Sequence, residues 1–465
     1  MATAGTAVLP DRLRKDLAAR FKGELIGPQD AGYGEARKLH NAMIDKRPGL
    51  IARCTDVDDV VAAVELAHRD GLLTAVRSGG HNAAGLGSCD GGLSIDLSPM
   101  HSVEVDPATR EVRAQGGCML KQVDAATHEH GLAVPAGIIG TTGVGGLTLG
   151  GGLGHLTRGF GLTIDNLIGA EVVLADGSVV NADEDENADL FWALRGGGGN
   201  FGVVTKFIFR GVPVKNVVAG PMLYPMEATA DVLRFYDEFI ATAPDELGGF
   251  FAFLTVPPGP PFPEELHLQK MCGVVWCYAG SQQDADEALA PVREFATPAL
   301  DGVMEMPLPD WQTAFDELYV PGHQWYWKAD FMSRLPDDAI AKHAEHGERM
   351  PKMFSTMHMY PIDGAAARVP SDATAWAYRG ARWAQVIVGV DPDPANAPLI
   401  REWARDYYDA LHQYSDGGAY VNMLQGDEGD DRVQATYGAN YERLVEIKRR
   451  YDPDNFFQVN QNITA

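Results

Sequence analysis

The chain has 465 residues, of which 45% are hydrophobic and 22% charged, a composition that excludes a disordered, collagen-like or coiled-coil protein. The formal net charge of −26 excludes the basic surface that binding to nucleic acid or to an anionic membrane requires. The length favours two domains, because single hydrophobic cores stop growing at roughly 250–300 residues.

Five cysteines without metal-ligand spacing predict neither a disulfide framework nor a metal site. No apolar run reaches the ~20 residues that span a bilayer, and residues 1–30 carry basic side chains without an apolar stretch. We therefore expect a cytoplasmic protein with no signal peptide and with neither a membrane nor a nucleic acid as partner. The sequence leaves its oligomeric state open.

The first part of the chain predicts short strands that alternate with helices. A β–α–β unit is expected at 50–77, with a helix that begins near Thr55, uses Asp58 as a capping partner, and ends at Gly71. Further strands are expected at 93–97, 102–105, 111–114 and 203–209, a hairpin at 171–180, and helices at 120–130 and 186–194.

Beyond about Val214 the aromatic residues become denser and prolines cluster. Strand-like runs alternate with helix-like runs as far as about Gly418, which predicts an antiparallel sheet with helices on one face. The strands are expected at 250–256, 273–278, 324–331, 353–361 and 383–389, and a final helix at 437–450.

Glycine is abundant and clustered. The 52 glycines are about 11% of the chain against an average of about 7%, and eleven of them lie between Gly137 and Gly161. Glycine within apolar sequence indicates a main chain that adopts positive φ or closely approaches a large flat ligand. The text Gly197-x-Gly199-x-x-Gly202 matches a dinucleotide fingerprint, but it follows a helix and opens a strand, so a Rossmann site is not expected.

The segment from Arg77 to Asn82 places His81 directly after two glycines and a buried strand. Such a histidine can approach a flat ring, and its neutral imidazole is a nucleophile at neutral pH. For a motif this short, a capping or core histidine is the commoner explanation when the motif is taken alone.

Three segments resemble the flavin-binding segments of the vanillyl-alcohol oxidase / p-cresol methylhydroxylase (PCMH-type) FAD superfamily. They are the loop 77–82 with Gly85, the glycine-rich stretch 134–166, and the segment 189–205. The end of the chain, at 419–422, 451–457 and 460–463, is similar to the terminal signature of the berberine-bridge-enzyme-like branch. The middle of the chain resembles the family only loosely, chiefly at 368–375.

The resemblance implies an α+β fold with a PCMH-type FAD-binding domain at 1–215, whose core is 45–215. A substrate-binding domain with an antiparallel sheet covered by helices is expected at 216–418. The C-terminal segment 419–465 is expected to return to the FAD-binding domain.

The resemblance also implies FAD bonded through its 8α-methyl group to His81. Relatives with a second attachment use a cysteine at the position of Ile139, so a single attachment is expected, similar to the bacterial 6-hydroxynicotine oxidase type. Leu147 stands where many relatives have a histidine. The residues expected to bind FAD are Arg77, Ser78, Gly79, Gly80, His81, Asn82, Gly85, Pro135, Gly137, Thr141, Thr142, Gly143, Gly145, Gly146, Gly150, Gly151, Gly154, Asn200, Gly202, Val203, Asn422 and Asn460.

Tyr420 and Asn422 are the expected catalytic residues. They lie two apart, so on a strand both would face one way, and the resemblance places them over the flavin with Tyr420 as base or substrate anchor. A phenol with a pKa near 10 is a poor base unless a cation or a hydrogen bond lowers that pKa, and Lys328 and Arg379 are candidate cations. The alternative for Tyr420 is a half-buried sheet aromatic.

Other aromatic and histidine residues are expected to be structural. Trp325 and Trp327 on one face of a strand, and Phe251 and Phe253 on another, are more typical of core than of a substrate platform. Paired histidines without a third ligand are expected to be solvated helix residues; they are His128, His130, His343 and His346.

The sequence thus predicts an FAD-linked oxidase that transfers a hydride from an alcohol or amine carbon to flavin N5 and is reoxidised by O₂ to give H₂O₂. One alternative is a dehydrogenase that uses another acceptor, because the position near Thr142 that governs oxygen access is not diagnostic here. A flavin-binding protein whose catalysis has decayed is the second alternative. The small-molecule substrate itself is not specified.

Overall fold

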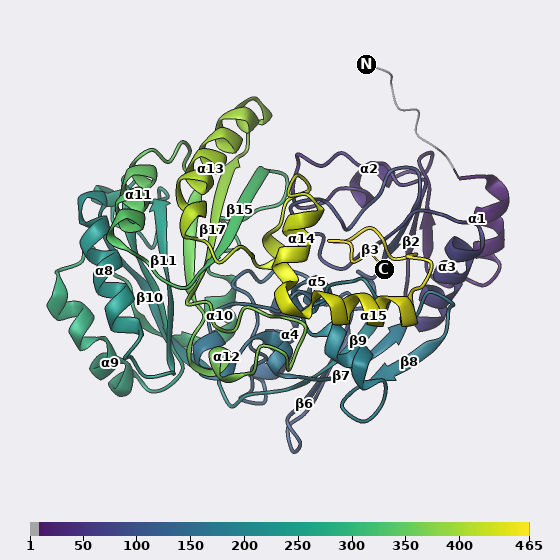
Figure 1. The fold of residues 1–465 in the computed structure, drawn as a ribbon, viewed down its shortest axis with the longest axis horizontal. Helices are drawn as coiled ribbons and strands as arrows, with labels where there is room; N and C mark the ends of the chain where they lie inside the picture. The colour runs from purple at the N-terminus through teal and green to yellow at the C-terminus, as the bar shows by residue number, and fades with distance from the viewer. Residues whose placement is uncertain (1–8, 465) are drawn as a thin grey trace.

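The computed structural model describes residues 9–464 and arranges their strands in three sheets (Figure 1). The first sheet has the order β1-β2-β4-β3, and β4 pairs in parallel with both β2 and β3. Its elements are α1 (Asp11–Ala18), β1 (Glu24–Ile26), α2 (Tyr33–Ala36), β2 (Leu50–Arg53), α3 (Val57–Arg69), β3 (Thr74–Arg77) and β4 (Leu93–Asp96).

The expected β–α–β unit is confirmed, with a different helix start. Asp56, rather than Thr55, is the N-cap of α3, and its carboxylate accepts a hydrogen bond from the backbone N–H of Asp59. Asp59 in turn accepts from the backbone N–H and hydroxyl of Thr55, so the threonine supports the cap from outside the helix.

The second sheet is antiparallel, with the order β5-β6-β9-β7-β8. Its strands are β5 (Val103–Asp106), β6 (Glu111–Gln115), β7 (Leu167–Val173), β8 (Val179–Ala182) and β9 (Val203–Arg210). The helices between them are α4 (Leu120–His128), α5 (Val144–Leu149), α6 (Thr157–Phe160) and α7 (Ala188–Leu194).

The third sheet is the expected antiparallel sheet. Its path is β13-β10-β12-β11-β16-β17-β15, and β14 also pairs with β10. Helices α8, α9, α11 and α13 cover one face, and the other face turns toward the first two sheets (Figure 1). The α+β fold class is therefore confirmed. The elements are β10 (Asn216–Pro225), α8 (Thr229–Ile240), β11 (Leu247–Thr255), β12 (Lys270–Tyr278), α9 (Gln282–Phe295), β13 (Leu300–Asp301), β14 (Met304–Pro307), α10 (Leu308–Thr313), β15 (Gln324–Met332), α11 (Asp337–Glu348), β16 (Thr356–Pro361), α12 (Gly364–Arg368), β17 (Trp383–Asp391) and α13 (Ala397–Leu411).

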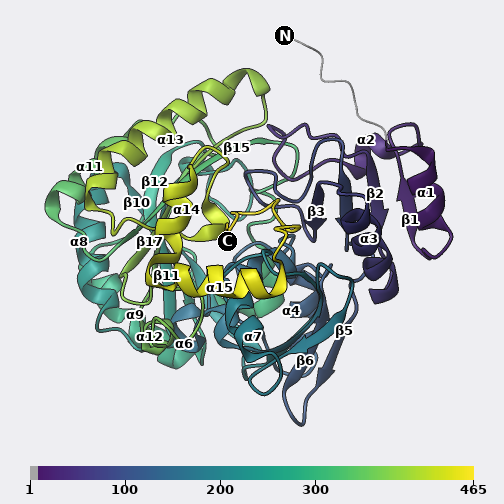
Figure 2. The ribbon, with the colours of Figure 1, turned by 45° about the vertical axis from the view of Figure 1, so that its right-hand side comes forward.

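The C-terminal segment lies across the junction between the sheets (Figure 2). The helix expected at 437–450 is α15 (Tyr441–Tyr451), and a 3₁₀ turn that begins at Gly438 separates it from α14 (Asp430–Tyr437), which was not expected. The expected strand around Tyr420 is wrong, because Val421–Met423 forms a 3₁₀ turn that Tyr420 caps. The turn lies against β15, and Ala419, Tyr420 and Val421 are buried in the largest hydrophobic cluster.

The expectation that the paired histidines are solvated is wrong for α11. His343 and His346 are buried because α11 packs against both α8 and α13. His343 Nδ1 lies 2.7 Å from the hydroxyl of Tyr407 on α13, and the ring of His346 stacks on Tyr407 at 4.8 Å. On α4 the expectation holds for the exposed His130, whereas His128 is half-buried.

Among residues 9–464, no helix is long and apolar enough to cross a membrane. In the same residues no cluster of three potential metal ligands occurs. The expectation about a signal peptide falls in part on residues 1–8, outside the described residues.

Candidate functional site

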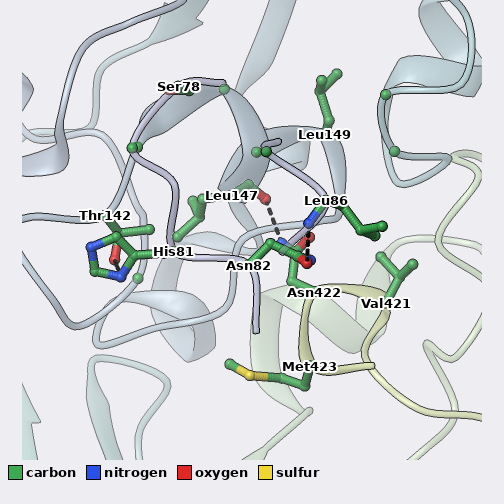
Figure 3. Close-up of a pocket in the computed structure, with 18 of the residues that line it drawn as sticks. Ser78, His81, Asn82, Leu86, Thr142, Leu147, Leu149, Val421, Asn422 and Met423 are labelled. Carbon is green, nitrogen blue, oxygen red and sulfur yellow. Dashed lines mark hydrogen bonds between the residues drawn. The ribbon is translucent and has the colours of Figure 1, made fainter. Parts of the chain in front are cut away.

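A cavity of about 310 Å³ lies where the three sheets meet. One wall is the main chain of the glycine-rich loops after β3 and around α5, part of which Figure 3 shows. The opposite wall is the face of the eight-stranded sheet that α8, α9, α11 and α13 do not cover, and the C-terminal segment adds Tyr420 to Met423 and Val459 to Gln461.

Fifteen of the predicted site residues come together around this cavity. They are Ser78, Gly79, Gly80, His81, Asn82, Gly137, Thr142, Gly143, Gly145, Gly146, Asn200, Gly202, Tyr420, Asn422 and Asn460. The other predicted residues are not part of this lining, and they are Arg77, Gly85, Pro135, Thr141, Gly150, Gly151, Gly154 and Val203.

Several of the predicted glycines, both in the lining and outside it, allow neighbouring segments to pack closely. A Cβ on Gly79 would lie 2.3 Å from the nitrogen of Gly143, so these two glycines let the loop that carries His81 rest on the segment before α5. A Cβ on Gly154 would lie 1.8 Å from the carbonyl oxygen of Ala136, and one on Gly150 would lie 2.2 Å from Oδ1 of Asn422. These glycines shape the wall of the site.

Two features of the lining fit the flavin that the sequence leads us to expect. Gly146 lines the cavity, and a Cβ there would meet no atom within 4 Å among the described residues, so the main chain is open to a flat ligand. The Oγ of Ser78 is buried and has no hydrogen-bond partner within residues 9–464. An uncovered backbone and an unsatisfied hydroxyl suit a ligand with a flat ring system and a diphosphate.

His81 lies at the cavity beside two threonines. Its Nε2 is 3.2 Å from Oγ1 of Thr141. Its Nδ1 is 3.5 Å from Oγ1 of Thr142, and Figure 3 shows these two residues side by side. Its ring stacks on the ring of His40 at 4.0 Å, a neighbour that the sequence motif did not reveal. Burial lowers the pKa of His81 to about 4. Burial, with repulsion from His81 and His323 were they also protonated, lowers the pKa of His40 to about 2. Both imidazoles are therefore neutral at pH 7.

Tyr420 and Asn422 meet although they are not on a strand. The Tyr420 hydroxyl oxygen accepts hydrogen bonds from the backbone N–H of Gly152 and from Nδ2 of Asn422, each at 2.9 Å. Nδ2 of Asn422 also donates to the carbonyl oxygen of Leu147 (Figure 3). Burial raises the pKa of Tyr420 above its ordinary value, and the hydrogen bonds from Gly152 and Asn422 oppose that rise.

The two cations expected near Tyr420 are engaged elsewhere. Lys328 forms ion pairs with Asp427 and Glu428, and Arg379 forms a bidentate pair with Asp165. Because both cations are paired with carboxylates, neither supports direct activation of this phenol, and its two hydrogen-bond donors are the groups that favour the phenolate.

The eight-stranded sheet contributes residues that sequence reasoning missed. The hydroxyl of Tyr319 lies 3.0 Å from His358 Nε2, and His358 Nδ1 lies 2.9 Å from the hydroxyl of Tyr360. Burial lowers the pKa of His358 to about 3. His358 and Tyr360 alternate with Met357 and Met359 along β16, so their common face was visible in the sequence, but the pairing of His358 with Tyr319, from the loop before β15, was not.

The tryptophans, expected in the core more than on a substrate platform, have both positions. Trp325 and Trp327 are indeed packed into the largest hydrophobic cluster, but both also line the cavity. Phe251 and Phe253 fit the core expectation, because they pack on the opposite face of the sheet with the helices.

Comparison with known proteins agrees with this geometry. A family model described as FAD binding domain matches residues 48–183, and one described as berberine and berberine like matches residues 419–464. An FAD-linked oxidoreductase of Dictyostelium discoideum is 30% identical over 430 residues, covering 92% of this chain and 91% of the relative.

Two further matches concern one kind of enzyme. (R)-6-hydroxynicotine oxidase of Paenarthrobacter nicotinovorans is 42% identical over 186 residues, covering 40% of this chain and 41% of that protein. The crystal structure of 6-hydroxy-D-nicotine oxidase from Arthrobacter nicotinovorans superposes with a TM-score of 0.84 at 26% identity, covering 95% of this chain and 98% of the other.

Proposed function

Because this chain belongs to the berberine-bridge-enzyme-like branch of the PCMH-type FAD-linked oxidoreductases, we propose that it is an oxidase with FAD bonded to His81. When bound, FAD accepts the hydride of the substrate carbon and passes two electrons to O₂, which yields H₂O₂. The observation that carries the proposal is a neutral imidazole in the lining of a glycine-walled cavity, with a buried phenol in the same lining.

His81 is suited to the attachment because its nitrogen lone pair is not blocked by a proton at pH 7. His81 would hold FAD through a bond between an imidazole nitrogen and the 8α carbon. Formation of that bond would release one hydrogen from the methyl group and one from the imidazole to O₂, as H₂O₂. Ile139, which also lines the cavity, has no side chain that can form a second bond.

Tyr420 orients the substrate and takes up its heteroatom proton. The backbone N–H of Gly152 and Nδ2 of Asn422 fix the position of the hydroxyl oxygen. Both groups donate to this oxygen, so both stabilise the phenolate that must exist before a proton is accepted. Hydrogen bonds to the charged form thus replace the missing cation.

The test of the oxidase assignment is reoxidation. The purified holoenzyme is reduced without air by a substrate or by dithionite and then mixed with air-saturated buffer in a stopped-flow instrument. An oxidase recovers its flavin absorbance within seconds and forms one H₂O₂ per flavin. Recovery over many minutes, together with fast recovery on an artificial quinone acceptor, contradicts the proposal and identifies a dehydrogenase.

A further inference from the structure

We propose that Arg379 is a positioning residue for Tyr420, because its buried ion pair with Asp165 holds the stretch of backbone that binds the Tyr420 hydroxyl. The inference rests on the proposed function and deepens it, since it names a residue outside the cavity lining on which the geometry of the phenol depends. Within residues 9–464 the guanidinium bonds to Asp165, Ala366 and Thr374. It does not bond to Tyr420, so its effect runs through the main chain.

That stretch of backbone is Gly151 and Gly152, which we call the glycine bend. The φ angles are +131° at Gly151 and +80° at Gly152, in the left-handed region that favours glycine. Two adjacent glycines have wide backbone freedom, so the direction of the Gly152 N–H group is set by the contacts around the bend. This N–H group lies 2.9 Å from the Tyr420 hydroxyl oxygen. The supports of the bend therefore decide how well the phenol is held.

The first support is the 3₁₀ turn Thr163–Asp165. The backbone N–H of Thr163 donates to the carbonyl oxygen of Gly152 at 2.9 Å, and that of Ile164 donates to the carbonyl oxygen of Gly151 at 3.1 Å. The hydroxyl of Thr163 lies 3.3 Å from the same Gly152 oxygen. Both carbonyl groups of the glycine bend are thus held by one short turn, and a turn of this kind has weak internal hydrogen bonds of its own.

Arg379 anchors this turn through Asp165. Its Nη1 and Nη2 lie 2.7 Å and 2.6 Å from the two carboxylate oxygens, and the two side chains are only 2% and 8% exposed. Oδ2 of Asp165 also accepts a hydrogen bond from the backbone N–H of Leu162 at 2.8 Å, which closes the turn. A bidentate pair fixes orientation as well as distance, so Arg379 sets the placement of the turn.

The second support is the indole of Trp376, which lies on the same segment as Arg379. A Cβ on Gly151 would lie 3.0 Å from Cδ1 of Trp376, so the indole packs directly against the glycine bend. The Arg379 guanidinium lies 5.1 Å from the centre of that indole. Arg379 thus steadies the bend from two sides, through the turn and through Trp376.

The consequence for Tyr420 has a definite sign. The hydrogen bond from Gly152 opposes the rise that burial causes in the pKa of Tyr420. A displaced Gly152 N–H group stabilises the phenolate less, so loosening the anchor raises that pKa further. Tyr360 on β16 is the titratable neighbour of Tyr420, and burial raises its own pKa well above the ordinary value, so it stays neutral while Tyr420 titrates.

The experiment titrates this one phenol in the protein as purified with its flavin. Tyr420 is replaced by 3-fluorotyrosine, whose fluorine resonance reports the ratio of phenol to phenolate and whose lower pKa keeps the titration within a range that a folded protein tolerates. Arg379→Lys keeps the charge but cannot bind both carboxylate oxygens. We expect it to raise the pKa at position 420 by about one, the effect of one weakened hydrogen bond to a charged group.

A second variant and a second measurement support the first. Thr163→Val removes only the hydroxyl that donates to Gly152, so it should raise the same pKa by less than Arg379→Lys does. Hydrogen exchange of the peptide that contains Gly152, measured by mass spectrometry on protein with its natural Tyr420, should be faster in Arg379→Lys than in wild type.

Arg382→Lys is the matched control. Arg382 pairs with Asp237 at 2.8 Å, and Asp237 belongs to α8 on the other face of the sheet, so this variant also weakens an ion pair but leaves the glycine bend untouched. We expect an unchanged fluorine titration. An unchanged pKa at position 420 in Arg379→Lys, or an equal shift in Arg382→Lys, overturns the proposal.

The two kinds of failure are distinguishable. If Tyr420→Phe reduces its flavin at the wild-type rate, the proposed catalytic role fails, whereas the fluorine titration still tests the positioning role of Arg379. If Arg379→Lys does not fold, Thr163→Val decides, and an unchanged pKa together with unchanged exchange at Gly152 overturns the proposal.

Discussion

At the scale of single residues, the cavity is built from groups that burial keeps uncharged. His81, His40 and His358 have lowered pKa values, and Tyr420 has a raised one. A neutral imidazole is ready to act as a nucleophile, whereas a protonated phenol must first lose its proton to act as a base. The structure therefore favours the role of His81 directly and that of Tyr420 through its two hydrogen-bond donors.

Tyr420→Phe tests that second role. The variant keeps the ring but removes the oxygen that Gly152 and Asn422 bind. We expect anaerobic flavin reduction to slow by about 10²–10⁴-fold, the usual loss for a general base, with unchanged flavin content. Single-turnover reduction measures the rate. Asn422→Ala should give a smaller loss and move the rising limb of the pH–rate profile to higher pH, because the pKa of Tyr420 rises when this donor is lost. A rate within about threefold of wild type would mean that Tyr420 only packs.

Gly146→Val tests whether the open backbone faces the cofactor. No described atom lies within 4 Å of a Cβ at Gly146, so the valine should fold normally and project into the cavity. We expect purified protein with a normal melting temperature and little flavin, measured by the ratio of visible to ultraviolet absorbance. Gly34→Val is the control, because Gly34 also lies in a helix with open space at its Cβ but does not line the cavity. Full flavin content in Gly146→Val would contradict this placement.

At the scale of elements, α15 fastens the C-terminal segment to the glycine-rich loops. Lys448 is fully buried, pairs with Asp452 at 2.6 Å, and donates to the carbonyl oxygens of Asn200 and Phe457. Asp452 accepts from the backbone N–H groups of Phe456 and Phe457. This ion pair and its hydrogen bonds thus hold both the glycine-rich loop before β9 and the segment that follows α15.

Lys448→Met should therefore be strongly destabilising. Removing one partner leaves the Asp452 charge buried and unpaired, which typically costs about 3–5 kcal/mol of the free energy of unfolding. Urea denaturation monitored by circular dichroism measures this, and Arg449→Met, an exposed neighbour on the same helix, is the control. If both variants lose the same small amount, Lys448 does not fasten this segment.

Elements were predictable from the sequence where local periodicity decides them. The strands β11, β12, β15, β16 and β17 follow apolar runs with clear alternation, and α3 follows a helical repeat between a cap and Gly71. The 3₁₀ turn at Val421–Met423 was not predictable, because its short apolar run fits a strand equally well. The burial of His343 depends on Tyr407, 64 residues away, and the wall role of Trp325 depends on loops from another sheet.

At the scale of the whole molecule, buried histidines link stability to pH. Burial lowers the pKa of His155, His343 and His358 to about 3, against about 6.5 in the unfolded chain. Below pH 6.5 the unfolded state binds more protons, so the stabilisation that is complete above pH 6.5 is lost as the pH falls toward those lowered values. His412 acts in the opposite direction, because the Asp330 carboxylate raises its pKa.

We therefore expect the free energy of unfolding to fall between pH 6.5 and pH 4.5. Urea titrations at half-unit pH steps measure it, and His343→Gln should reduce the slope by about one proton. A free energy that is flat or rising as the pH falls through this range would contradict the burial of neutral histidines.

We propose the domain limits expected from the sequence, with a substrate-binding domain at 216–418 between the two parts of the FAD-binding domain. The eight-stranded sheet begins at Asn216, and the family match for the C-terminal segment begins at residue 419. Residues from all of these parts line the cavity.

The most direct test is acid precipitation of the purified yellow protein followed by mass spectrometry of its peptides. We predict that wild-type flavin stays in the pellet and that the peptide containing His81 carries the additional mass of the flavin. His81→Ala should release the colour to the supernatant. Wild-type flavin that leaves entirely with acid, or a flavin mass on any peptide other than that of His81, would contradict the attachment on which the account rests.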